Sequence, residues 1–86
     1  MESLVSMQTS DQIRMSRAAL GWSIATLATK SFVSVSTIKR LETDDGFLKA
    51  TEANLRLIRE TLEAAGIEFI GEPNDGPGVR LWTKQN

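Results

Sequence analysis

Hydroxyl residues at the expected starts of helices divide most of this chain into short segments. The residues are Ser10, Ser23, Ser34 and Thr51. Each precedes a run with helical spacing, and a side-chain oxygen there can accept a hydrogen bond from a free amide of the first turn. The first three predict short helices over residues 11–20, 24–30 and 35–42. Helices this short are not stable alone in water, which favours a small bundle in which they pack together.

The fourth helix carries the clearest amphipathic pattern. It follows Thr51 and closes at Gly66, and its apolar residues recur at steps of three and four, which places them on one face. These residues are Leu55, Ile58, Leu62 and Ala65. Just before this helix, residues 43–46 read Thr-Asp-Asp-Gly, a set of turn formers that we expect to break the chain.

Beyond Gly66 the apolar period becomes that of a strand. Residues 67–70 and 79–83 alternate loosely, and residues 71–78 between them are mostly Gly, Pro, Asn and Asp. This pattern predicts a C-terminal β-hairpin with a long connection. The fold class is therefore mainly α, a four- to five-helix bundle with a C-terminal β-hairpin or dimerising strand.

Composition excludes several classes of protein. The 86 residues suffice for one domain and include no Cys and no His, which excludes a disulfide frame, a zinc finger and a Cys- or His-based active site. There is no Gly-rich phosphate loop, and the adjacent Asp44 and Asp45 form only an isolated pair. We therefore expect no enzyme, no metal and no cofactor. No apolar run approaches the roughly 20 residues of a membrane span, and the N-terminal residues do not resemble a signal peptide.

Charge is distributed unevenly along the chain. The net charge is −1, yet residues 12–42 carry five basic residues against Glu42 alone, a local net charge of +4. Residues 43–86 carry five bases and eight acids, a net charge of −3. The first half is thus suited to face phosphate and the second half a partner or solvent, although ordinary charge scatter is the alternative.

The second and third predicted helices, joined by a turn of about three residues, have the form of a helix-turn-helix. In the third, Ile38 and Leu41 share one side and point inward. The outward residues left over are Val35, Ser36, Lys39 and Arg40. Lys and Arg can bond guanine O6 and N7, Ser can bond several base edges, and Val can pack on a thymine methyl. We expect these four residues to read DNA bases, with solvated charges and a half-buried valine as the alternative.

A second set of side chains surrounds this helix and is suited to phosphate oxygens. We expect contacts to the DNA backbone from Ser23, Lys30, Ser31, Ser34 and Thr37, together with amides at the helix starts. Capping alone also explains the serines that precede helices.

The ordered set of short motifs resembles a known family. Residues 17–23 read Arg-Ala-Ala-Leu-Gly-Trp-Ser and are followed by Leu-Ala at 27–28, Val-Ser at 33–34, Ser-Thr-Ile at 36–38 and Arg-Leu-Glu at 40–42. This series, with residues 62–70 and 76–81, is similar to the XRE family of Cro and phage-repressor-type regulators over about residues 12–82. The resemblance implies a helical bundle, a double-stranded operator bound by a homodimer, and no catalysis. It also implies an ion pair between Arg17 and Glu42 that joins the first and third helices.

Two departures from the family pattern open a second interpretation. Ile24 stands where the family usually has a glutamine that contacts DNA, and Phe32 stands where it usually has glycine. Without glycine, the turn is expected to avoid the left-handed conformation or to be slightly strained. The alternative function is therefore a protein-interaction module, antitoxin-like or anti-activator, with a second protein as its partner.

The C-terminal hairpin is the expected dimer surface. Its candidate interface residues are Phe69, Ile70, Val79, Leu81 and Trp82. In a regular strand, residues 79 and 81 face the bundle and residues 80, 82 and 84 the opposite side. An exposed tryptophan on an edge strand would favour pairing with a second copy, whereas the alternative places it in its own core. The expected organisation is a flexible arm over residues 1–9, a helix-turn-helix DNA-binding domain over 10–66 and a dimerisation segment over 67–86. The expected protein is a cytoplasmic, nucleoid-associated regulator that acts as a repressor.

Overall fold

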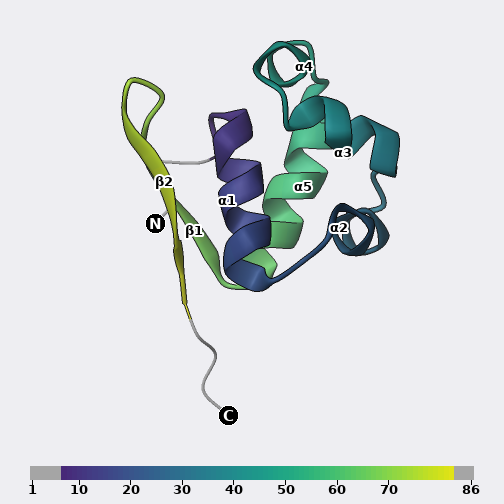
Figure 1. Cartoon of the computed structure of the whole chain (residues 1–86), viewed down its shortest axis with the longest axis horizontal. Helices are drawn as coiled ribbons and strands as arrows, with labels where there is room; N and C mark the ends of the chain where they lie inside the picture. The colour runs from purple at the N-terminus through teal and green to yellow at the C-terminus, as the bar shows by residue number, and fades with distance from the viewer. Residues whose placement is uncertain (1–6, 83–86) are drawn as a thin grey trace.

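Residues 7–82 are described by the computed structural model, and they form five helices followed by a two-stranded antiparallel hairpin (Figure 1). The elements are α1 (Ser10–Leu20), α2 (Ile24–Ser31), α3 (Val35–Leu41), α4 (Asp44–Leu48), α5 (Glu52–Ala64), β1 (Ile67–Glu72) and β2 (Asp75–Leu81). The prediction of a mainly helical fold with a C-terminal hairpin is confirmed. No helix within residues 7–82 is long and apolar enough to cross a membrane.

One apolar core joins the helices to the hairpin. Its fully buried members come from α1, α2, α3, α5 and β1: Ile13, Leu27, Ile38, Leu41, Ile58, Leu62 and Phe69. Helix α2 packs against both α3 and α5, and β2 packs against α1. Because Phe69 is only 2% exposed, it is a core residue of the single chain. Its expected place at a dimer interface was wrong.

The first helix begins one residue earlier than the sequence predicted. The N-cap is Thr9 rather than Ser10: the Thr9 hydroxyl accepts from the Gln12 amide, and the Gln12 side chain accepts from the Thr9 amide. Ser10 is buried and donates to Asp44 Oδ1 at 2.6 Å. Met7 is also buried in the core, so residues 7–9 do not form the loose arm that we expected. The rest of that predicted arm lies outside the described residues.

Residues 43–46 start a helix instead of breaking the chain, so that prediction was wrong. The Thr43 hydroxyl accepts from the amide of Gly46 at 3.0 Å, which caps α4. Asp44 and Asp45 occupy the first turn of α4, where negative charge stabilises a helix. A Cβ at Gly46 would clash with the carbonyl oxygen of Arg40. The four residues therefore suit a tight helix start, although the same residue types also form turns.

The hairpin has a short connection, not the long one that was predicted. Only residues 73 and 74 separate the strands, and Glu72 pairs with Asp75. The ladder is irregular between Ile70 and Glu72, where Gly71 has a φ of 82° that other residues adopt at a cost. The residue types that suggested a loop thus lie inside the paired strands.

Candidate nucleic-acid interface

Helices α2 and α3 are short and are joined by only three residues, Phe32–Ser34. Both helices have the N-caps that the sequence predicted. The Ser23 hydroxyl accepts from the Thr26 amide at 3.0 Å, and the Ser34 hydroxyl accepts from the Thr37 amide at 3.2 Å. Capping therefore fixes where each helix starts.

The predicted division of α3 into buried and exposed side chains is confirmed. Ile38 is 0% exposed and Leu41 is 2% exposed, and both belong to the core. On the other side, four side chains reach solvent: Val35, Ser36, Lys39 and Arg40. The exposed side of α3 thus presents two cations, a hydroxyl and a branched apolar group.

Hydroxyl groups line the start of this exposed side. The Ser34 hydroxyl donates to Thr37 Oγ1 at 2.9 Å and lies 3.3 Å from Ser36 Oγ. Arg40 Nη2 donates to the same Thr37 oxygen at 3.2 Å. Within residues 7–82 neither Lys39 nor Arg40 has a carboxylate partner within 4.0 Å. Their charges are therefore free to meet an anion without first breaking an ion pair among these residues.

The five expected phosphate contacts are not all at the surface. Ser23 and Ser34 are exposed, and Thr37 is half-buried. Lys30 is exposed, with its ammonium 5.2 Å from the centroid of the Trp22 ring. Ser31 is only 1% exposed, and its oxygen accepts from the Val33 amide. The expected phosphate contact from Ser31 was therefore wrong, because α2 continues through this residue and buries it.

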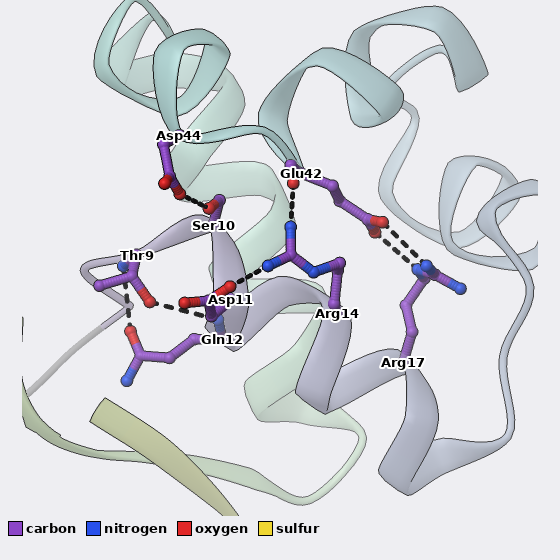
Figure 2. A network of polar contacts seen from close by, with 8 residues as sticks. All are labelled: Thr9, Ser10, Asp11, Gln12, Arg14, Arg17, Glu42 and Asp44. Carbon is purple, nitrogen blue, oxygen red and sulfur yellow. Dashed lines mark hydrogen bonds and ion pairs between the residues drawn. The ribbon is translucent and has the colours of Figure 1, made fainter. Parts of the chain in front are cut away.

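The expected ion pair between Arg17 and Glu42 is present, and Figure 2 shows it joining α1 to the residue after α3. Arg17 donates from Nε to Glu42 Oε2 at 2.6 Å and from Nη2 to Oε1 at 2.8 Å. The hydrogen bonds to Glu42 raise the pKa of the Arg17 guanidinium above its ordinary value, and partial burial opposes that rise. Arg17 also donates to the carbonyl of Trp22 at 3.1 Å, so it also contacts the segment between α1 and α2.

A second arginine of α1 reinforces the same junction. Arg14 donates to the carbonyl oxygen of Glu42 and to the carboxylate of Asp11 (Figure 2). Both arginines of α1 are therefore engaged within the chain. The local charge counted from the sequence overstates the available basic surface, which consists of Lys30, Lys39 and Arg40.

The turn between α2 and α3 contains a phenylalanine in a backbone conformation that glycine adopts more easily. Phe32 adopts the left-handed conformation, with φ 63° and ψ 23°, and is the one non-glycine residue with positive φ among residues 7–82. Its side chain is 89% exposed. The turn therefore does not avoid the left-handed conformation, which costs energy in a residue other than glycine. Ile24 is half-buried and packs against the core.

The end of the hairpin carries a polar cluster around an exposed indole. Trp82 is 59% exposed, and its Nε1 donates to Glu68 Oε1 at 2.8 Å. Arg80 pairs with the same oxygen at 3.2 Å and lies 5.7 Å from the Trp82 ring centroid. Val79 packs against the core, as expected, but Leu81 is 40% exposed. Trp82 therefore does not close the core of its own chain.

Two features of the structure were missed by the sequence analysis. One is Gln12, whose place three residues after Thr9 fits a capping box and could have been recognised. The other is a groove between α2 and α5, where Leu57 lies off the apolar stripe of α5 as an unexplained apolar residue.

In comparisons with known proteins, no family model, no curated protein and no solved structure matches the chain.

Proposed function

We propose that this protein is a sequence-specific DNA-binding transcriptional regulator that acts as a homodimer, most simply as a repressor. The observation that carries the proposal is α3 itself. A short, capped helix turns two apolar residues into the core and presents two free cations, a hydroxyl and a valine to solvent. That combination suits the floor of a major groove, where base edges offer acceptors and methyl groups.

The roles of the exposed residues follow from their chemistry. Lys39 and Arg40 donate to guanine O6 and N7, Ser36 bonds a base edge, and Val35 packs on a thymine methyl. The exposed Ser23 and Ser34 hydroxyls contact phosphates and set the position of α3 along the duplex. The Arg17–Glu42 ion pair holds α3 on α1 and so keeps this orientation fixed.

A homodimer would read an inverted repeat, with two copies of α3 in successive major grooves roughly 34 Å apart. A repressor of this kind acts by occupying the operator. Two surfaces are candidates for the contact between copies. One is the exposed part of the hairpin, with Ile70, Leu81 and Trp82, supported by Val79 beneath. The other is the groove beside Phe32.

The test begins with a selection of bound sequences from random DNA duplexes by the full chain. We expect an enriched inverted repeat. Arg40→Ala should then weaken binding to that repeat by about 1–3 kcal/mol and relax the preference at one base pair. Arg56→Ala, which removes the same charge from an exposed site on α5, is the matched control and should change affinity little. Equal losses in both variants, or no binding at low salt, would overturn the proposal.

One observation favours a second candidate, a protein-interaction module that uses the same fold. The ring of Phe32 is almost fully exposed, and no base contact requires an aromatic residue in that turn. Stoichiometric capture of a protein by the full chain, without retention of DNA, would support this alternative over DNA binding.

A further inference from the structure

A hollow with a volume of about 540 Å³ lies between α2 and α5. We call it the α2–α5 groove. On the α2 side it is lined by Trp22, Lys30 and Phe32, and on the α5 side by Leu57, Glu60 and Ala64. Its walls are therefore mostly apolar, with one cation and one anion on opposite sides.

Phe32 lies at the edge of this groove in a left-handed backbone conformation whose energetic cost is not offset by burial of its side chain. A left-handed backbone brings the Cβ of an L-residue too close to the following carbonyl, whereas glycine adopts it freely. Burial of the ring could offset that cost, but the side chain is 89% exposed. Within the single chain, glycine would be the more stable residue at this position. An exposed aromatic ring on a strained backbone is the kind of feature that a contact with another molecule would explain.

We propose that the other molecule is a second copy of this chain, and that each Phe32 inserts into the α2–α5 groove of its partner. A projecting ring beside a hollow is self-complementary, because a two-fold axis gives each ring the hollow of the other copy. The inserted ring would pack on Leu57 and beside Trp22, whose ring has the Lys30 ammonium 5.2 Å from its centroid, and Ala64 leaves space for it. The inference rests on the proposed function insofar as that function requires a homodimer.

The charges at the groove fit the same two-fold arrangement. Lys30 and Glu60 lie on opposite walls, and within residues 7–82 neither forms an ion pair. In a two-fold contact, residue i of one copy meets residue j of the other and the reverse. Each Lys30 therefore faces the partner's Glu60, which gives the apolar contact a matching polar rim.

The hairpin is less suited to the same contact. The indole N–H of Trp82 already donates to Glu68, and the Arg80 guanidinium lies over the ring. This cluster satisfies its polar groups within its own chain, whereas Phe32 has neither burial nor a relaxed backbone. The groove also includes none of the exposed residues of α3, so pairing there leaves that helix free.

The first experiment compares the full chain with Phe32→Gly and Trp82→Ala by sedimentation equilibrium. We expect the full chain and Trp82→Ala to be dimers of equal affinity, and Phe32→Gly to weaken association at least about 30-fold, as for a buried aromatic anchor. At concentrations where both are monomeric, Phe32→Gly should also melt at a higher temperature than the unaltered chain. A monomeric unaltered chain, an undiminished Phe32→Gly dimer, dissociation by Trp82→Ala or a lower melting temperature for Phe32→Gly would each overturn the proposal.

A charge exchange tests the rim separately from the ring. Lys30→Glu and Glu60→Lys should each weaken association, and the double variant should restore most of it, because the two charges then meet in the reversed order. Additive losses in the double variant would contradict the two-fold contact between Lys30 and Glu60.

Measurements of DNA binding distinguish a failure of the proposed contact through the α2–α5 groove from a failure of the proposed function. Phe32→Gly should bind the full inverted repeat more weakly but keep the preference for each half-site, whereas Arg40→Ala should remain a dimer. If the unaltered chain dimerises through Phe32 but enriches no DNA, only the proposed function fails. If DNA binding persists with dimers that do not depend on Phe32, only the inference from the groove fails.

Discussion

Among the polar side chains that attach α1 to the rest of the molecule, Gln12 and Arg17 differ in charge, burial and partner. Gln12 is 0% exposed; its Nε2 donates to the carbonyls of Ile70 and Gly78 at 3.1 and 3.0 Å. Arg17 is 21% exposed and bonds the Glu42 carboxylate. One residue attaches the hairpin to α1 and the other attaches α3.

The difference in partners explains what each attachment can do. Gln12 binds backbone carbonyls on both strands, and its Oε1 accepts from the amides of Gln8 and Thr9, so a neutral amide is satisfied on both sides. Arg17 binds one particular side chain at the end of the proposed reading helix. We infer that Gln12 serves stability alone, whereas Arg17 serves both stability and the orientation of α3.

Gln12→Ala should have the largest effect on stability. It leaves two carbonyls and two amides without their partner in a partly buried region, and we expect a loss of about 2–4 kcal/mol in the free energy of unfolding. Urea denaturation measures this loss. Thr29→Ala, at an exposed site on α2, is the control and should change stability by less than about 0.5 kcal/mol. A similar small change for Gln12→Ala would show that the hairpin does not depend on this side chain.

Glu42→Ala should have the next largest effect on stability, a loss of about 2 kcal/mol in the free energy of unfolding. Breaking a fully buried pair costs more, but Arg17 is partly exposed and can recover some hydration. In a double-mutant cycle, Arg17→Ala with Glu42→Ala should cost less than the sum of the single variants. Glu42→Ala should also weaken DNA binding in protein that is still folded, whereas Gln12→Ala should not. If both variants changed DNA affinity equally, the two attachments would not have the separate roles inferred above.

The same two residues show what the sequence could and could not predict. The Arg17–Glu42 pair was predicted, because the resemblance to a known family supplied both positions, which carry opposite charges. The role of Gln12 was not predicted, because its partners are backbone carbonyls 58 and 66 residues away. Every residue has a carbonyl, so no side-chain pattern marks such a contact.

Other differences have similar physical causes. Helix α4 was missed because Thr-Asp-Asp-Gly suits a helix start as well as a turn, and the choice depends on the chain packed behind Gly46. Phe69 was placed at an interface because strand alternation indicates two faces but not which molecule covers each one. In α3 the spacing of Ile38 and Leu41 was sufficient to predict which side chains are exposed, because a buried face on a short helix leaves only one exposed side.

Thr9→Ala should have the smallest effect and shows how far the Gln12 attachment depends on its surroundings. The substitution removes the hydroxyl that accepts from the Gln12 amide at 3.3 Å, but it leaves the Thr9 amide that donates to Gln12 Oε1. Loss of an N-cap costs typically about 1 kcal/mol, and the two bonds to the hairpin should remain. Amide hydrogen exchange should therefore increase at the first turn of α1 and stay unchanged in β1 and β2. Faster exchange throughout the hairpin would instead mean that the cap holds Gln12 in place, so that the attachment through Gln12 depends on one partly buried hydrogen bond at the start of the helix.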